Sequence, residues 1–555
     1  MRILTLAIAL SLGLAGCAHK HGHDQAAVAE PAPPPASAQS ETLDRIEVSG
    51  SRIGAMHAPA KMVAEFVAPA PLPVDRENYA QVDENPIHLV EKQPLSTFSI
   101  DVDTGSYSNV RRMLNAGRLP SADAVRSEEF LNYFDYGYAV PERGGQPFSV
   151  TTEIAPSPWH RNRHLLLVGL KGYEVPKAQV PAANLVFLID TSGSMHSADK
   201  LALLKQSFRL LVQQLRPQDR VAIVAYAGSA GLVLESTPGS DKASILASLD
   251  RLQAGGSTHG SAGIQLAYDV AQQHFIAGGA NRVILASDGD FNVGTVNHEA
   301  LKDLVAEKRK TGIALTTLGF GGGNYNDALA EQLANVGNGQ HAYIDTLNEG
   351  RKVLVESLSS TLLTIAADVK VQIEFNPAVV AEYRLIGYEN RLLRREDFSN
   401  DQVDAGEIGA GHSVTALYEL ALTGSGGEAI EPLRYATQAA ADGNPKAAEL
   451  AHLRLRYKSP GEDVSRLIET PILRRDIAGE ASERLRFASA VAGFAEALRG
   501  GRHLGDWTLD DVLATARSAR GEDAFGYRGE FLQLVEMARA LSSQRPQDGH
   551  LAAPE

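Results

Sequence analysis

The chain has 555 residues, of which 44% are hydrophobic and 21% are charged, and its formal net charge is -15. A chain of this length and composition can build several hydrophobic cores, which excludes a wholly disordered polymer. The excess of acidic residues argues against a nucleic-acid partner, because such binding depends on Lys and Arg that neutralise phosphates.

The first residues are organised like a secretory signal. The charged start Met1-Arg2 precedes an apolar run over 3–14, and two small residues precede Cys17, the only cysteine of the chain. This segment resembles a bacterial lipoprotein signal with a lipobox over 14–17, and the resemblance implies a lipid on Cys17. Ala18 after the cysteine favours the outer membrane by the same resemblance. An ordinary signal peptide with an incidental cysteine is the alternative.

No later apolar run approaches the about 20 residues that a membrane helix needs, so we expect a chain that is anchored to the membrane and does not span it. Residues 18–85 are rich in Ala, Pro, Ser and His. Because such a composition buries little apolar surface, it predicts a disordered tether.

Order resumes near Leu95, where residues 95–100 alternate as a strand does. The run from Asp101 to Ser108 is rich in side-chain oxygens and could be a second metal loop, but no buried strand precedes it. A turn that caps a helix over 109–116 is the better interpretation. A further short helix is expected over 128–134.

Short strands with alternating apolar and polar residues flank the middle of the chain. A few hairpin strands alone are not stable in water, so strands from both flanks are expected to form one antiparallel β-sandwich with another domain inserted. These strands are predicted over 148–154, 164–170, 369–375, 414–420 and 453–457.

The inserted region begins with five consecutive apolar residues, 185–189, which predict a strand buried on both faces. Asp190, Ser192 and Ser194 follow this strand directly. A helix over 200–215 follows. In an open α/β sheet, ligands bind at the carboxyl ends of strands, which is where this loop would lie. Carboxylate and hydroxyl oxygens are ligands that suit Mg²⁺ or Mn²⁺, so the loop is predicted to bind such a metal. The alternative is that the loop is only the start of a helix capped by a serine.

Two more loops place oxygen side chains after further βα units. Thr258 lies in the glycine-rich run 255–263, and Asp288 follows the apolar strand 282–287. The set resembles the metal ion-dependent adhesion site of the von Willebrand factor type A domain, whose motif matches Asp190, Ser192, Ser194, Thr258 and Asp288.

The resemblance implies a doubly wound, mostly parallel sheet with helices on both faces and with Mg²⁺, or Mn²⁺, at its top. It also implies that a vacant metal position takes a Glu or Asp from a partner, with adhesion or assembly as the outcome. A strand over 313–319, another over 341–345 and a closing helix over 350–365 complete the predicted domain. The glycines of 321–323 lack the Gly-Lys-Ser/Thr that grips a nucleotide, so no nucleotide is expected.

From Ser482 onward the apolar residues recur at helical spacing, which predicts a helical domain with Trp507 and Phe525 in its core. This region and the segment 95–138 also resemble parts of a group of bacterial lipoproteins. The predicted organisation is signal peptide 1–17, tether 18–85, helical or mixed segment 86–146, sandwich strands 147–180, type A domain 181–366, sandwich 367–460, helical domain 461–545 and disordered tail 546–555.

We therefore expect a lipid-anchored, Mg²⁺-dependent protein-binding module of the cell envelope, located at the outer membrane and facing the periplasm. Its partner would be an envelope protein that offers an acidic side chain to the metal, and no enzymatic activity is expected. One alternative is a metal-dependent hydrolase, for which His259 and Asp290 are the titratable neighbours of the site. The other is a structural envelope protein whose metal is capped by a carboxylate of the same chain.

Overall fold

The computed structural model describes residues 77–142, 144–256, 260–289, 298–323, 325–403, 405–431 and 448–544. All of them belong to the unit Leu72–Glu555. Cys17, Thr258, His259 and Asp290 lie outside these ranges, as do the predicted signal peptide, most of the predicted tether and the predicted tail. Within the described ranges, no helix has both the length and the apolar character needed to cross a membrane.

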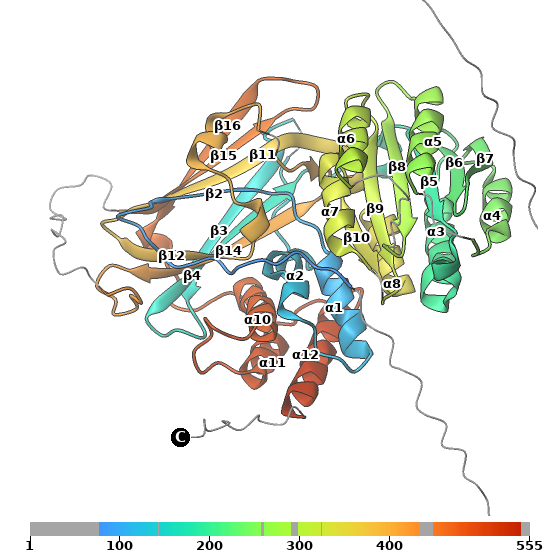
Figure 1. The fold of residues 1–555 in the computed structure, drawn as a ribbon. Coiled ribbons are helices and arrows are strands. Elements are labelled where there is room, and N and C mark those ends of the chain that lie inside the picture. Colours follow the sequence, from blue (N-terminus) through green and yellow to red (C-terminus); the bar gives the residue numbers. More distant parts are fainter. Residues whose placement is uncertain are drawn as a thin grey trace, which may run out of the picture. The chain divides into compact units, whose positions relative to one another are not determined.

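A six-stranded sheet with helices on both faces forms the middle of the chain (Figure 1). Its strand order is β10-β9-β8-β5-β6-β7, and β7 is an antiparallel strand at one edge of an otherwise parallel sheet. Every residue of β5 is buried, as a central strand covered on both faces requires. The strands are β5 (Ala183–Asp190), β6 (Arg220–Tyr226), β7 (Ala230–Pro238), β8 (Ala280–Ser287), β9 (Ala314–Phe320) and β10 (His341–Ile344).

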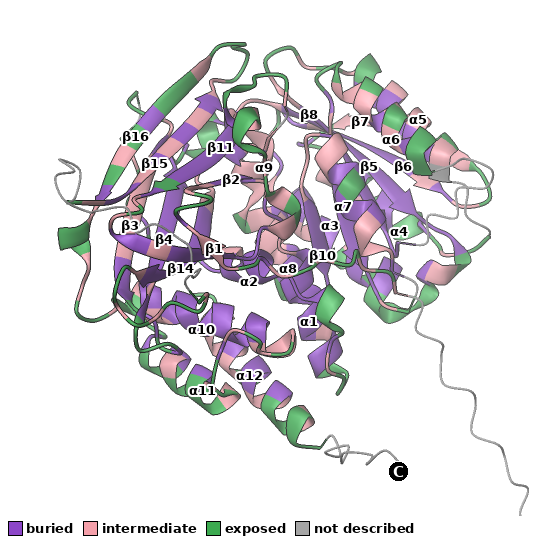
Figure 2. Ribbon diagram, turned by 60° about the vertical axis from the view of Figure 1, so that its left-hand side comes forward, coloured by how far each residue is buried: buried purple, intermediate pink, exposed green. Residues whose placement is uncertain are grey.

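Each face of this sheet packs against its own layer of helices, and the sheet separates two apolar clusters (Figure 2). Phe187 of β5 contacts Phe208 on one face, whereas its neighbour Val186 belongs to the cluster of Ile264 on the other. The first face carries α3 (Leu203–Gln214), α4 (Lys242–Arg251), α8 (Leu347–Arg351) and α9 (Leu358–Leu362), and the second carries α5 (Gly260–Gln273), α6 (His298–Arg309) and α7 (Asp327–Val336).

Antiparallel strands from both sides of this α/β domain form a β-sandwich. β4 precedes the domain and pairs with β14, which follows it, so that Leu167 lies opposite Leu417. The two sheets have the orders β1-β12-β14-β4-β3 and β13-β11-β15-β16, with β2 added to β11. The fold class predicted from the sequence, an α/β domain inserted in an antiparallel sandwich, is confirmed. The strands are β1 (His88–Leu89), β2 (Leu95–Ser99), β3 (Phe148–Pro156), β4 (Arg163–Gly172), β11 (Thr364–Phe375), β12 (Val380–Ile386), β13 (Ile408–Gly409), β14 (Ser413–Leu422), β15 (Glu449–Lys458) and β16 (Ser465–Leu473).

Helices from the two ends of the described chain share one core against the outer face of the sandwich. Phe130 of the N-terminal segment packs against Phe494, which in turn packs against Phe531. Leu167 and Leu417 of the sandwich belong to the same cluster. The helices are α1 (Gly105–Asn115), α2 (Ser127–Asn132), α10 (Glu483–Leu498), α11 (Leu509–Ser518) and α12 (Tyr527–Ser543).

The structure corrects two predicted details of helices and core. The closing helix predicted over 350–365 contains a π-helical turn, Lys352–Glu356, and ends at Leu362, because β11 begins at Thr364. Phe525 is 56% exposed, because it lies in the connection between α11 and α12, where its ring faces the Arg351 guanidinium.

The predicted capping turn before α1 is also different. Thr104 precedes α1 without a capping hydrogen bond from its side chain. The carboxylate of Asp103 accepts instead from the backbone N–H of His341 at 2.7 Å, a contact with β10. The oxygen-rich run therefore connects the N-terminal segment to the α/β domain.

Candidate metal site

Residues 190–196, which begin with the last residue of β5, are called the metal loop below, and this loop is held against a second loop at the carboxyl end of the sheet. The backbone N–H of Gly193 donates to the carbonyl of Gly256 at 3.0 Å, and the N–H of Gly255 donates to the carbonyl of Thr191 at 2.8 Å. The hydroxyl oxygens of Ser192 and Ser194 lie 2.9 Å apart. The fold therefore brings two of the predicted ligands together.

Asp190 forms the floor of this site and is fully buried. Its Oδ1 accepts from the N–H of Ser192 at 2.8 Å, and its Oδ2 accepts from the hydroxyl groups of Ser287 at 2.9 Å and Tyr226 at 3.3 Å. Burial raises the pKa of Asp190 to about 6, the hydrogen bonds from Ser192 oppose this rise, and the nearby Asp288 adds to it. A cation at this position would favour the ionised form.

Asp288, at the end of β8, is also fully buried and forms an ion pair with a lysine. The Nζ atom of Lys200 donates to Oδ2 of Asp288 at 2.9 Å, and the lysine side chain is 9% exposed. Asp288 contributes to the raised pKa of Asp190, so the two carboxylates are close enough to repel each other. Among the described residues, the site thus holds two buried carboxylates and one buried ammonium.

The donor set fits a hard divalent cation. Asp190, Asp288, Ser192 and Ser194 offer only oxygen atoms, which are the ligands that Mg²⁺ and Mn²⁺ prefer. Among the residues that the structure describes, no three His, Cys, Asp or Glu side chains group as metal ligands. Hydroxyl groups and water would therefore complete the coordination of a cation held by the described residues. Thr258, the fifth predicted ligand, lies outside the described residues.

Sequence reasoning missed three side chains of the site. Ser287 directly precedes Asp288, and Tyr226 ends β6, so both could have been found among the polar residues at the carboxyl ends of the strands. Lys200 gave no such signal, because it stands where a helix was expected to begin.

The matches to known families cover nearly all of the described chain. Residues 184–354 match the von Willebrand factor type A domain, residues 73–167 match a family described as von Willebrand factor, and residues 360–541 match the C-terminal family of the uncharacterized protein YfbK. The uncharacterized protein YfbK of Escherichia coli (strain K12) is 48% identical over 470 residues, which covers 84% of this chain and 81% of the relative. The chain belongs to the YfbK family.

Other proteins are similar to the YfbK-family chain at lower identity. An uncharacterized protein of Synechocystis is 30% identical over 190 residues, which covers 33% of this chain and 43% of that protein. A solved structure, a von Willebrand factor type A protein from Catenulispora acidiphila, is 14% identical with a TM-score of 0.39 and covers 70% of this chain and 91% of that one.

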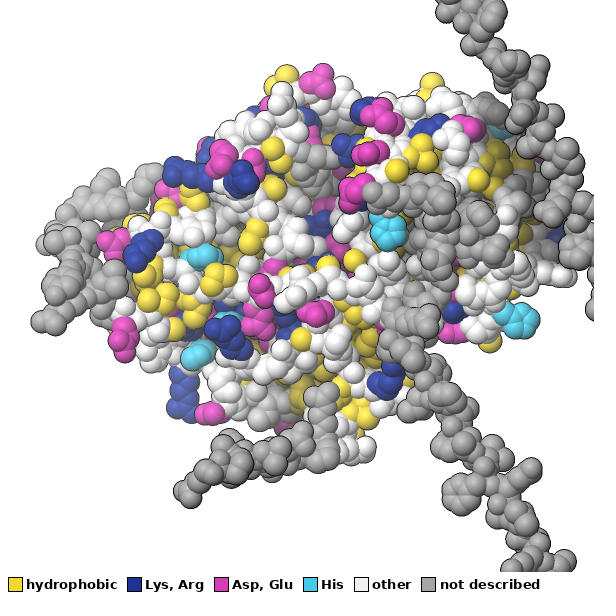
Figure 3. All heavy atoms as spheres, in the orientation of Figure 1, with side chains coloured by type: hydrophobic (Ala, Val, Ile, Leu, Met, Phe, Trp, Pro, Cys, Tyr) yellow, Lys and Arg dark blue, Asp and Glu magenta, His cyan; other side chains and the backbone are white. Residues whose placement is uncertain are grey.

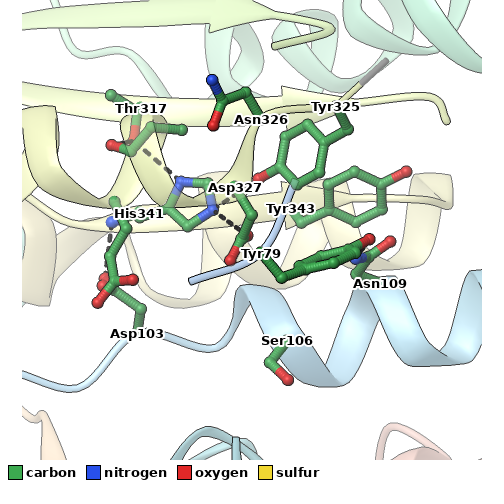
Figure 4. Close-up of polar contacts among 12 residues, drawn as sticks. Tyr79, Asp103, Ser106, Asn109, Thr317, Tyr325, Asn326, Asp327, His341 and Tyr343 are labelled. Atoms are coloured by element: carbon green, nitrogen blue, oxygen red, sulfur yellow. Dashed lines mark hydrogen bonds and ion pairs between the residues drawn. The ribbon is translucent and has the colours of Figure 1, made fainter. Parts of the chain in front are cut away.

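A second polar cluster of the YfbK-family chain lies where β10 meets the segment before α1, and Figure 4 shows it around His341. The Nδ1 atom of His341 lies 3.0 Å from the Thr317 hydroxyl, and Nε2 lies 2.7 Å from the Tyr325 hydroxyl and 3.4 Å from Oδ1 of Asp327. Asp103 accepts from the backbone N–H of the same histidine. Sequence reasoning did not identify this cluster.

Burial alone would lower the pKa of His341, but Asp327 and Asp103 outweigh it and raise this pKa above its ordinary value. Burial, with a contribution from Asp101, raises the pKa of Asp103 to about 7. Because the histidine is only 3% exposed, the cluster is closed to a substrate. It serves as a junction between the N-terminal segment and the α/β domain.

A polar groove of about 510 Å³ lies between the α/β domain and the sandwich, near the start of β8. Its buried Arg282 donates to the hydroxyl of Thr316 and to the carbonyl of Thr361, both at 2.7 Å. Arg391 forms an ion pair with Glu331 at 2.8 Å. These charged groups are engaged with neighbours, and the groove is at the end of the sheet opposite to the one where α/β domains bind ligands. The metal loop is therefore the stronger candidate.

The surface in Figure 3 mixes acidic and basic side chains. On this face the described Lys and Arg side chains alternate with Asp and Glu and form no continuous basic stripe.

Proposed function

We propose that this YfbK-family chain is a lipid-anchored protein-binding module of the bacterial cell envelope and that its binding depends on Mg²⁺ or Mn²⁺. The observation that carries the proposal is the metal loop of a von Willebrand factor type A domain, in which Asp190, Ser192 and Ser194 lie beside Asp288 at the carboxyl end of the sheet. The family match favours binding over catalysis.

The burial pattern supports binding of a partner at this loop. The two carboxylates lie at the floor, whereas Ser194 is half-buried and Gly193 and Gly256 are exposed. When bound, the metal would supply an electrophilic position that attracts a carboxylate. Ser192 and Ser194 would contribute neutral oxygens, so the protein would not neutralise that position completely. An acidic side chain of an envelope protein is the expected ligand.

The anchor is the second part of the proposal. The lipobox over 14–17 would place a lipid on Cys17, with the outer membrane as the expected location and the periplasm as the compartment that the module faces. The alternative of a metal capped by the chain itself lacks support in the described residues, where no third carboxylate joins Asp190 and Asp288 as a ligand.

Calorimetric titration of the full-length chain with Mg²⁺ tests the metal site. We expect Asp190→Ala and Asp288→Ala to abolish binding, because each removes one of two charged ligands. Asp199→Ala is the matched control, since Asp199 is an exposed carboxylate just beyond the same loop and its removal should leave the affinity unchanged. Equal Mg²⁺ affinity in all four proteins would show that the loop is only a helix start.

A further inference from the structure

Lys200 is placed unusually for a lysine. It lies in the π-helical turn Ala198–Ala202, and its backbone angles, φ -116° and ψ -106°, are not helical. This break turns the side chain inward toward Asp288, while Leu201 of the same turn and Leu204 of α3 remain in the apolar cluster on one face of the sheet. The ammonium reaches the floor of the metal site.

The aliphatic part of Lys200 fills a space that the chain keeps open for it. A Cβ atom on Gly321 would lie 2.4 Å from both Cγ and Cε of the lysine, and Gly321 has a φ of +65°, which only glycine adopts readily. The Tyr343 hydroxyl donates to the carbonyl of Gly321 at 2.6 Å and fixes this position. The ammonium is thus held at Asp288 by packing as well as by charge.

The position of Lys200 changes the net charge of the site. Asp190, Asp288 and Lys200 together leave one net negative charge when all three are ionised. A divalent cation changes this to one net positive charge. Without the lysine, the charges of the metal and the two described carboxylates would sum to zero, and the loaded site would attract an anionic ligand less strongly.

We propose that Lys200 is a tethered cation that regulates the metal site. It neutralises Asp288 when no metal is bound, and it therefore weakens metal binding. Once the metal is bound, the charge of Lys200 makes the site positive, and the lysine therefore strengthens the capture of a carboxylate. The inference rests on the proposed metal site, and it predicts effects of opposite sign on the two ligands, which a purely structural lysine would not produce.

The test is a titration of the full-length chain with Mg²⁺, followed by a titration of the Mn²⁺-loaded chain with acetate, monitored by water-proton relaxation. Lys200→Gln removes the charge but keeps an amide that can donate to Asp288, and Lys200→Met removes both. We expect both variants to bind Mg²⁺ about tenfold more tightly or better, because a like charge no longer faces the metal, and to require more acetate for half-saturation. The control Lys205→Met should behave as wild type, since the Nζ atom of Lys205 donates to the carbonyls of Asp250 and Leu252, away from the site.

The outcomes separate the inference from the metal site itself. If Asp190→Ala abolishes Mg²⁺ binding while Lys200→Gln binds as wild type does, the metal site stands and the inference is overturned. Weaker Mg²⁺ binding by Lys200→Gln also overturns it, because the lysine would then only position Asp288. Binding of Mg²⁺ by Lys200→Gln but not by the wild type supports the inference in its strongest form. If no variant binds Mg²⁺, both proposals fail. Circular dichroism checks folding, and Lys200→Gln decides the matter if Lys200→Met does not fold.

Discussion

Replacing Arg111 by Met would remove the cation at the centre of a buried ion-pair network. Arg111 lies on α1 and is 1% exposed. Its guanidinium donates to both carboxylate oxygens of Asp345, at 2.7 and 2.5 Å, and to Glu349 at 2.7 Å, both in the α/β domain. It also pairs with Glu530 of α12 at 2.7 Å. One side chain therefore connects three separate parts of the chain.

The expected cost follows from the burial of the carboxylates that lose their partner. Asp345 is 3% exposed and Glu349 is 1% exposed, so neither can regain its hydration in the folded state. Removing one partner of a buried pair costs about 3–5 kcal/mol. Lys352 limits the loss: burial lowers its pKa to about 7, and the charge of Arg111 adds to this effect, so the lysine is more readily charged in the variant. We therefore expect the loss to lie at the lower end of this range, at about 3 kcal/mol, which is still a large part of the total stability of about 5–15 kcal/mol.

Urea denaturation of the full-length chain measures this loss. Arg517→Met is the control, because Arg517 is 58% exposed and pairs with Glu536 on the surface, where such pairs contribute about 0–1 kcal/mol.

The loss should also depend on pH. Burial raises the pKa of Asp345 in the folded chain, and Arg111 opposes this rise. Without Arg111 the folded pKa of Asp345 rises further, so the folded variant binds a proton at Asp345 more readily than the unfolded chain does. The loss should therefore shrink as the pH falls. Adding Glu349→Gln should restore part of it. A loss no larger than that of the control, or one that is independent of pH, would refute the reasoning.

Three further predictions concern the metal loop, the histidine cluster and the anchor. Ser192→Ala should weaken Mg²⁺ binding in calorimetry without abolishing it, because water can replace a neutral oxygen. His341→Gln should lower the free energy of unfolding more at about pH 6 than at about pH 9. Asp327 helps to raise the pKa of His341 in the folded chain, and the stability that this provides is lost as the pH rises through the folded pKa. Equal losses at both pH values would contradict this. Cys17→Ala should leave the protein unprocessed or move it to the soluble fraction, and flotation of a cleaved variant with membranes would place the anchor elsewhere.

The α/β domain could be predicted from sequence because its signals lie in residues that are neighbours in the chain. Parallel strands buried on both faces read as continuous apolar runs, as Leu185–Ile189 does, and polar residues directly after them mark the end where ligands bind. The edge strand β7, with mostly half-buried and exposed residues, gave no such signal. The insertion in a sandwich was predictable for a different reason, since neither group of flanking strands could be stable alone.

The remaining features depend on contacts between residues far apart in the sequence. Arg111 and Glu349 are separated by 238 positions, as are Asp103 and His341. Neither spacing nor periodicity predicts such pairs. Lys200 shows the same limit at the site: a helical pattern predicts its helix, but only the break at this residue and the glycine at 321 turn its side chain toward Asp288.

The two edges of the sheet in the α/β domain are covered differently by the described chain. At the β10 edge, α1 packs against the sheet, Arg111 joins Asp345 and Glu349, and Asp103 joins His341. At the other edge, β7 pairs only with β6 among the described strands. The metal loop follows β5, which lies between these edges, and it contacts the glycine-rich loop at Gly256 on the β6 side. Among the described residues, the chain's own N-terminal segment covers the β10 edge, so we expect a partner that offers a carboxylate to the metal loop to approach from the β6–β7 side.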